Sequence, residues 1–251
     1  MASGLDIKRS MGITRGKKDT IDAKRIALYG YRLKDEIKPS SYVTPAINQL
    51  KSLMSLRKKL VKQRAGYKAV LKEQKLVFAA KEFKAIFIIQ ERLIHYLSKQ
   101  IDQLENEIES IINKDKELHQ NLNLILGIKG IGKQMATTML ITTHNFKKFE
   151  TWRKFAAYSG IAPFPYQSGT SIKGKTKVSH LANKEVKTAI HLCALSAIQH
   201  NPEMRTYYLK RIKKGSSKMS TINIIRNKLI ARIFAVVKRQ TPYVDTMKFV
   251  A

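Results

Sequence analysis

The sequence predicts a mainly α-helical protein, and three of its features indicate this class. Proline is absent from residues 46–162, and glycine is absent between Gly66 and Gly127. The segment between these two glycines is rich in Lys, Glu, Leu, Gln and Ile, most of which favour helices. Apolar residues also recur at helical spacing. A hydrophobic content of 43% over 251 residues is that of a folded chain with one large or two small domains.

Residues 1–45 contain one predicted helix, TIDAKRIALYGYRL, which cannot bury a core alone. We therefore expect this segment to be part of a larger domain. Asp19 and Asp22 are its candidate site, because a spacing of three places both carboxylates on one helix face, where they could share a divalent metal with other acids. Asp19 could instead be the N-cap, with Asp22 in the first turn. Taken alone, the spacing favours the cap.

Residues 46–118 are predicted to form long helices with a coiled-coil seam. Leu53, Leu56 and Leu60 step by three and four along the first half. The second half repeats the pattern at Ile101, Leu104, Ile108 and Ile111. The pattern fits an antiparallel helical hairpin with a turn near residues 76–84. It fits an intermolecular coiled coil that makes a homo-oligomer equally well. An amphipathic helix pair that packs on its own domain would give the same periodicity.

Residues 119–251 are expected to form a compact helical domain. Its candidate helices are 133–142, 149–158, 182–199, 203–213 and 218–238. Aromatic residues recur through its first part, at Phe146, Phe149, Trp152, Phe155 and Tyr158. This spacing favours a packed core over a ladder for stacking bases.

The stretch LILGIKGIGKQMATTML, residues 124–140, is typical of a helix-hairpin-helix. Gly130 and Gly132 could let backbone N–H groups approach a phosphate at a helix N-terminus, and Lys129 and Lys133 flank them. An ordinary helix-to-helix turn would give the same spacing. The basic composition favours the DNA-binding interpretation.

The stretch PYQSGTSIKGK is interpreted as a mobile, hydroxyl-rich loop. It carries Ser168, Lys173 and Lys175 but no neighbouring His or Asp that could activate a serine. Considered alone, it is a polar turn. Farther along, Lys218, Arg226, Lys228 and Arg232 alternate with apolar residues, which predicts an amphipathic helix with a cationic face for phosphates.

The charge identifies the class of partner. Lysine and arginine number 48 against 18 acidic residues, giving a formal charge of +30, and polyanions are the natural partners of such a chain. The longest apolar run, residues 85–89, is too short to cross a bilayer, and the first residues do not resemble a signal peptide. We expect a cytoplasmic, nucleoid-associated protein that does not bind membranes. The single cysteine, Cys193, is predicted to lie in the core, and the six histidines lack the spacing of a zinc site.

Four segments together resemble the IS110 family of insertion-sequence transposases, which are recombinases with a DEDD acid tetrad and a bridge RNA as guide. The segments are RSMGITRGKKDTIDAKRIA, GIKGIGKQMA, FAAYSGIAPFPYQSGTSIKGKTKVSHLANKEVK and NPEMRTYYLKRIKKGSSKMSTINIIRNKLIARIF. They occur in the family's order and span nearly the whole chain. The resemblance is therefore specific.

The resemblance implies a RuvC-like, ribonuclease-H-type domain joined by a coiled coil to a C-terminal transposase domain. Residues 1–45 would be the end of the first domain, 46–118 the coiled coil and 119–251 the transposase domain. Asp19 and Asp22 match the last two acids of the Mg²⁺-binding tetrad, and Ser168 matches the serine that links covalently to DNA.

The first two acids of the tetrad have no counterpart here. The sequence therefore predicts an N-terminally truncated transposase that binds DNA and a guide RNA but recombines DNA poorly alone. One alternative is a non-enzymatic nucleic-acid-binding protein or repressor derived from a transposase. A second, weaker alternative is an accessory factor that binds Holliday junctions.

Overall fold

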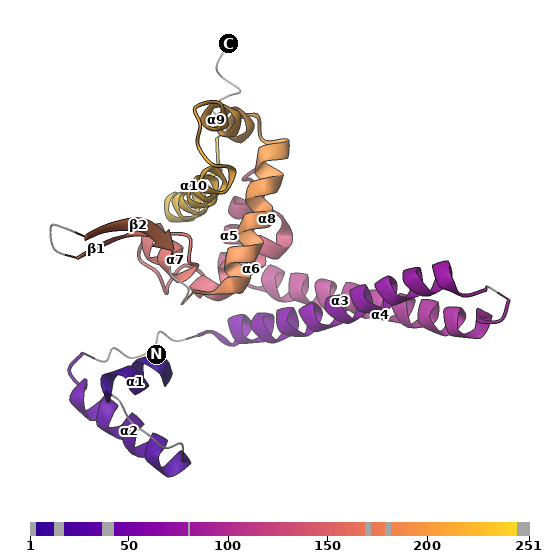
Figure 1. The fold of residues 1–251 in the computed structure, drawn as a ribbon, viewed down its shortest axis with the longest axis horizontal. Coiled ribbons are helices and arrows are strands. Elements are labelled where there is room, and N and C mark those ends of the chain that lie inside the picture. The colour runs from indigo at the N-terminus through magenta and orange to yellow at the C-terminus, as the bar shows by residue number, and fades with distance from the viewer. Residues whose placement is uncertain are drawn as a thin grey trace. The chain divides into compact units, whose positions relative to one another are not determined.

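The computed structural model describes residues 4–12, 18–36, 43–79, 81–168, 172–178 and 182–244 (Figure 1). The chain divides into two compact units, residues 1–42 and 43–251. The first unit contains α1 (Gly4–Ser10) and α2 (Asp19–Arg32). The second contains α3 (Pro45–Val77), α4 (Lys84–Lys114), α5 (Lys116–Leu126), α6 (Lys133–Thr143), α7 (Trp152–Tyr158), β1 (Pro163–Ser168), β2 (Ile172–Val178), α8 (Lys184–His200), α9 (Pro202–Lys213) and α10 (Lys218–Arg239). The mainly α class is confirmed.

The helix α2 has no buried residue. Ile26 is 57% exposed and Tyr31 is 73% exposed. These apolar side chains are left uncovered by the described part of the first unit. This agrees with the expectation that one helix at this end of the chain cannot build a core alone.

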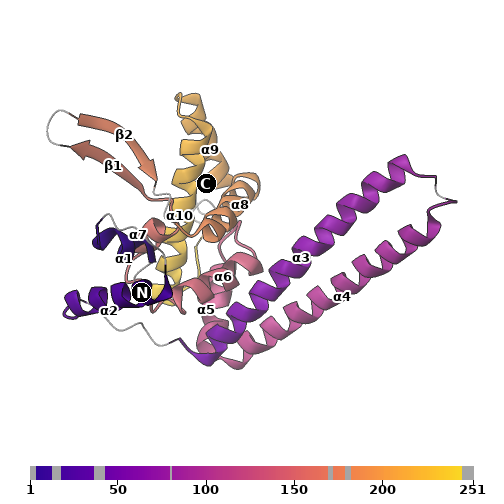
Figure 2. The ribbon, with the colours of Figure 1, turned by 60° about the horizontal axis from the view of Figure 1, so that its bottom comes forward.

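The helices α3 and α4 form an antiparallel hairpin, in which α3 ends at Val77 and α4 begins at Lys84 (Figures 1 and 2). The predicted hairpin, with its turn near residues 76–84, is therefore confirmed. The N-terminus of α3 is fixed by Thr44, whose Oγ1 accepts a hydrogen bond from Ile47 N at 3.4 Å, and by Pro45 in the first turn. Phe78 and Phe83 stack at the turn, with ring centroids 4.4 Å apart.

Two arginines lie in the seam of this hairpin. Arg57 donates from Nε to Glu105 Oε1 at 2.7 Å, and Arg64 Nη1 donates to Ser98 Oγ at 3.1 Å. Leu56 is 46% exposed, so its predicted place in the seam is wrong. Since Arg57 occupies the neighbouring seam position, Leu56 faces away from α4.

The C-terminal helices begin and end close to their predicted bounds, with α7 starting three residues late. The core is centred on α10, which buries residues along most of its length: Thr221, Ile222, Ile225, Arg226, Leu229, Ile230, Ile233, Val236 and Val237. Ile47, Leu50 and Ile112 from the base of the hairpin belong to the same core. The hairpin and the C-terminal helices therefore share one core instead of packing separately.

The aromatic series packs into this core, as the sequence analysis predicted. Phe155 is fully buried, and its ring centroid lies 5.2 Å from that of Phe149 and 5.6 Å from that of Phe234. Tyr158 lies against the same two residues, Phe149 and Phe155. These rings therefore pack against one another.

The stretch interpreted as a mobile loop is mostly a two-stranded antiparallel ribbon of β1 and β2. Pro163 pairs with Val178 and Ser168 with Ile172, with a register shift between Phe164 and Tyr166. The loop was predicted because this stretch is rich in glycine and hydroxyl residues. Ladder hydrogen bonds instead extend along the lysine-bearing stretch IKGKTKV.

None of the described helices is both long enough and apolar enough to span a membrane.

Candidate nucleic-acid interface

Ser168 is the last residue of β1 and pairs with Ile172, the first residue of β2. Lys173 pairs with Gln167, and Lys175 follows two positions later in β2. The connection at 169–171 lies outside the described residues. Ser168 therefore stands where β1 ends, and Figure 2 shows the ribbon of β1 and β2 extending from the helical body.

Both ends of the segment that carries the ribbon are fixed to helices. At the entry, Asn223 and Asn227 of α10 donate to the Ile161 carbonyl oxygen at 2.9 and 3.2 Å. At the exit, Asn183 Nδ2 donates to the Tyr158 hydroxyl of α7 at 2.8 Å. The Asn183 backbone N–H also donates to the Tyr158 carbonyl, and its side chain caps α8. The backbone of the ribbon is therefore anchored at its base by α7 and α10.

A second candidate feature is a basic segment that spans α9 and the start of α10. No Asp or Glu occurs between Glu203 and Asp245. We define the α9–α10 basic segment by its exposed cations, Arg205, Lys210, Lys213, Lys214 and Lys218. Only Lys218 was singled out from the sequence. The long acid-free stretch is the signal that could have identified the other four.

Two further cations of α10 are engaged within the protein. Lys228 is half-buried, and its Nζ lies 4.4 Å from the centroid of the Tyr207 ring. Arg226 is only 6% exposed, and its Nη2 donates to His191 Nδ1 at 2.6 Å. The prediction that Arg226 lies on an exposed cationic face is therefore wrong, because its side chain reaches inward to α8.

Arg226 and His191 form a part-buried contact, and the pKa of each group is lowered. Burial lowers the pKa of Arg226. Burial is also the first cause that lowers the pKa of His191, and the charge of Arg226 is the second. A neutral His191 is thus the form that accepts the hydrogen bond from Arg226.

The glycine turn joins α5 to α6, as the spacing predicted, but packing accounts for one of its glycines. Gly130 has φ +96°, and a Cβ at this position would lie 2.7 Å from Ala197 Cβ on α8. Gly132 is the N-cap of α6 and has open space around it. The close approach at Gly130 is therefore to a neighbouring helix, and phosphate binding by this turn stays a prediction.

Two lysines flank this turn and both are exposed. Lys133 forms an ion pair with Glu109 Oε2 at 3.2 Å, and Lys129 precedes Gly130.

Cys193 lies beneath the turn and is buried, as predicted. Burial raises the pKa of its thiol, and a backbone hydrogen bond from Gly132 partly opposes that shift.

The two acids of the first unit lie in the first turn of α2. Lys18 is the N-cap and makes no side-chain capping bond, so the alternative that Asp19 caps this helix is wrong. Asp22 Oδ1 pairs with Arg25 Nη1 at 3.0 Å. Among the residues that the structure describes, no three His, Cys, Asp or Glu side chains are placed to hold a metal ion. Asp19 and Asp22 alone do not make a complete Mg²⁺ site.

Comparison with known proteins bears on these features together. Residues 122–209 match the model of the family described as Transposase IS116/IS110/IS902. The match includes the glycine turn, the ribbon with Ser168 and most of α9. Residues 122–209 are therefore similar to the transposases of this family. The resemblance found in the sequence is thereby confirmed.

Relatives extend the likeness beyond residues 122–209. The chain is 27% identical over 236 residues to the pilin gene-inverting protein of Moraxella bovis, covering 94% of this chain and 70% of the relative. It is 27% identical over 147 residues to a 43.6 kDa protein of insertion element IS110 from Streptomyces coelicolor, covering 59% of this chain and 36% of that protein. A 42 kDa protein of insertion element IS900 from Mycobacterium paratuberculosis is 24% identical over 151 residues, covering 59% and 38%.

Proposed function

We propose that this chain acts in DNA transposition or inversion through a covalent phosphoserine at Ser168. The observation that carries the proposal is the placement of Ser168 at the end of a lysine-bearing ribbon, within the segment matched by the transposase model. The names of the relatives support a reaction that rearranges DNA. DNA as the substrate would place the protein at the bacterial nucleoid.

The proposed reaction conserves the number of phosphodiester bonds. Ser168 Oγ attacks the phosphorus, an Oγ–P bond forms, and the bond from phosphorus to one bridging deoxyribose oxygen breaks. The serine proton is transferred to solvent or to a base, and the leaving oxygen gains a proton. A second DNA end can then attack the phosphoserine and release the serine, so the strand is rejoined without a high-energy cofactor.

Cations would hold the DNA for this step. The α9–α10 basic segment supplies exposed charge with no acidic neighbour in its own sequence. Lys173 and Lys175 of β2 follow Ser168 closely along the chain. Binding through such cations depends steeply on salt, since each phosphate contact releases condensed counterions.

Mg²⁺ is the cofactor that the family resemblance implies. Mg²⁺ takes six oxygen ligands in strict octahedral geometry, whereas Asp19 and Asp22 supply two carboxylates, one of them paired with Arg25. The residues described here do not fit the ion by themselves. We therefore assign no step to Mg²⁺, and a complete site would need further acids.

The proposal extends to two partners. A guide RNA is a second polyanion that suits a chain of charge +30. A second copy of the chain could pair along the α3–α4 hairpin, where Leu56, Tyr67 and Tyr96 are exposed apolar residues. Both partners are measurable with purified protein, by co-purified RNA and by light scattering.

A trapping experiment tests the proposed chemistry. Labelled element-end DNA is incubated with protein, guide RNA and Mg²⁺, or with a chelator, and run on a denaturing gel. We expect a slow-migrating DNA adduct that is lost in Ser168→Ala and kept in Ser171→Ala. Binding without any adduct would leave the alternative, a nucleic-acid-binding protein without strand transfer.

A further inference from the structure

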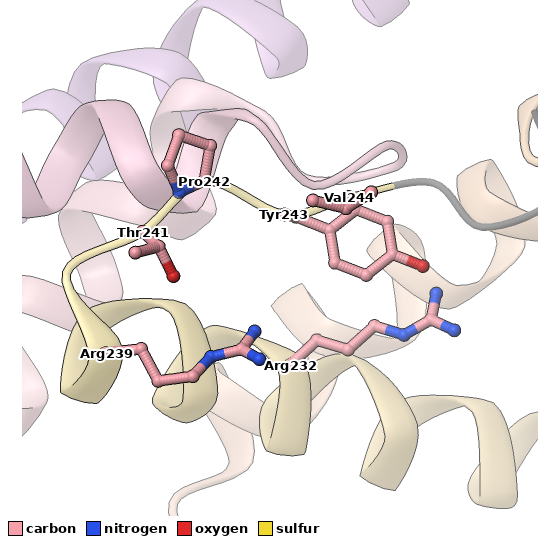
Figure 3. A pocket seen from close by; sticks show the side chains of 6 residues that line it. All are labelled: Arg232, Arg239, Thr241, Pro242, Tyr243 and Val244. Atoms are coloured by element: carbon pink, nitrogen blue, oxygen red, sulfur yellow. The ribbon is translucent and has the colours of Figure 1, made fainter.

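A pocket lies between the C-terminal half of α10 and the segment that follows it. Its lining residues are Arg232, Arg239, Thr241, Pro242, Tyr243 and Val244 (Figure 3). The chain reverses at Gln240, which has φ 52° and donates from Nε2 to Asn121 Oδ1 at 2.9 Å. This anchored turn brings residues 241–244 back alongside α10. The pocket, of about 600 Å³, is large enough for a nucleotide.

Arg232 is held in place and keeps one donor unused. Its Nη2 bonds Glu203 Oε1 at 2.5 Å, and its guanidinium lies 4.8 Å from the centroid of the Tyr243 ring. The Tyr243 hydroxyl bonds Glu203 Oε2 at 3.1 Å. Arg232 Nη1 is buried and has no hydrogen-bond partner in the described chain. A buried donor without an acceptor is costly, and a shift of this side chain towards an acceptor bound in the pocket would remove that cost.

Arg239 supplies the net charge of the pocket. Its Nε donates to the Ala235 carbonyl at 3.3 Å, and its terminal nitrogens have no hydrogen bond to any described residue. Glu203 balances the charge of Arg232, so the charge of Arg239 is the one available to an anion. The Thr241 hydroxyl lines the same pocket (Figure 3). Two planar guanidinium groups and a hydroxyl are donors suited to phosphate oxygens.

We infer that this pocket binds a phosphate of a single-stranded nucleic acid, together with its unstacked sugar or base. The phosphate would contact Arg239 and Thr241, and Arg232 Nη1 would reach it after a shift of the Arg232 side chain. Pro242, Tyr243 and Val244 form an apolar wall, which suits a nucleoside that has left the stack. A duplex keeps its bases inside, so it would use the cations but not this wall. The inference rests on the proposed nucleic-acid binding and adds a site outside the ribbon and the α9–α10 basic segment.

A matched pair of variants tests the pocket. Arg239→Gln and Lys238→Gln each remove one exposed cation from the last turn of α10, but Lys238 does not line the pocket. Binding of a fluorescent single-stranded oligonucleotide is measured by anisotropy over a range of salt concentrations. We expect Arg239→Gln to weaken binding about tenfold and to lower the salt slope by about 0.7. Lys238→Gln should change the affinity by about twofold or less.

Three results would overturn the inference, and a competition assay with phosphate gives one of them. Equal losses in the two variants, with binding by the unaltered protein intact, would show that only general charge matters at this end of α10. A selective loss for duplex DNA would exclude a single-strand site. Inorganic phosphate that competes with the oligonucleotide in the unaltered protein and not in Arg239→Gln is expected. If phosphate binds the pocket but Arg239→Gln leaves oligonucleotide binding unchanged, the pocket is a site for free anions instead.

Photocrosslinking gives a second readout that does not depend on the stability of a variant. An oligonucleotide with a photoreactive base is irradiated with the unaltered full chain, and the attached peptide is sequenced by mass spectrometry. We expect attachment at Tyr243 or Pro242. Attachment only to the ribbon or to the α9–α10 basic segment would disprove the pocket and leave the proposed function standing. No binding of any oligonucleotide would remove both.

Discussion

Gly130 packs directly against Ala197, and the two residues join the α5–α6 turn to α8. A Cβ on Gly130 would lie 2.7 Å from Ala197 Cβ and 2.8 Å from its Cα. The backbone at Gly130 also has φ +96°, which side chains other than glycine rarely adopt. Packing therefore explains this glycine fully, whether or not the turn also meets DNA.

Gly130→Ala should lower the free energy of unfolding by roughly 2–4 kcal/mol, from steric overlap and from the positive φ. Gly132→Ala is the matched control two residues away, where a Cβ meets nothing within 4 Å. We expect it to cost about 1 kcal/mol or less, as a change of N-cap residue. Denaturant unfolding measures both. Equal costs would contradict the packing argument.

The His191 imidazole should make the protein less stable in mild acid. Burial and the charge of Arg226 lower its pKa in the folded chain, whereas an unfolded histidine titrates near about 6.5. Below that pH the unfolded chain binds a proton that the folded chain resists. The free energy of unfolding should therefore fall as pH drops through about 6.5 towards the folded pKa, and stay level above it.

His191→Asn tests this assignment, because the Asn Oδ1 can accept the bond from Arg226 without titrating. Unfolding of both proteins is followed from about pH 7.5 to pH 5. The variant should lose part of the acid slope and keep the part due to His144, whose pKa is also lowered by burial and by nearby lysines. An unchanged slope in His191→Asn would exclude His191 as its source.

Charge on the α9–α10 basic segment should matter more for DNA binding than charge elsewhere. Lys213→Gln with Lys214→Gln removes two exposed cations there, and Lys68→Gln with Lys72→Gln removes two from α3. We expect the first pair to lower the slope of log affinity against log salt by up to about 1.8 for duplex DNA. The α3 pair should leave that slope nearly unchanged. Similar losses from both pairs would show that binding follows net charge alone.

Arg57, one of the two arginines in the seam, should set the register of the α3–α4 hairpin. The Arg57–Glu105 contact is half-exposed, with Nη2 and Oε1 2.5 Å apart. A double-mutant cycle with Arg57→Met and Glu105→Gln should give a coupling of about 0.5–1 kcal/mol that shrinks in high salt. A coupling near zero would mean that apolar contacts alone align the two helices.

Helix positions could be predicted from the sequence because they depend on local signals. The signals that start these helices can be recognised in the sequence: Pro202 in the first turn of α9, and the caps Asn183 and Ser217. The α3–α4 hairpin was equally visible in its lack of proline and glycine. What periodicity missed was the polar seam, where Arg57 replaces the expected Leu56.

Side-chain direction and the ribbon needed the structure. On α10, Arg226 and Lys228 have the same spacing pattern as exposed cations, yet Arg226 is buried against His191 from α8. That contact joins residues 35 positions apart, so no local pattern reveals it. The ribbon was missed because glycine and serine near its turn suggested a loop, while its pairing is set by cross-strand hydrogen bonds.

The most direct test of the account is to identify the residue that carries DNA in the trapped adduct. The adduct is digested with nuclease and protease, and the peptide that keeps a nucleotide is sequenced by mass spectrometry. We predict phosphoester attachment at Ser168, in a peptide that also covers Thr170 and Ser171. Attachment at Thr170, Ser171 or any other residue, or an adduct that persists in Ser168→Ala, would contradict the proposed serine chemistry.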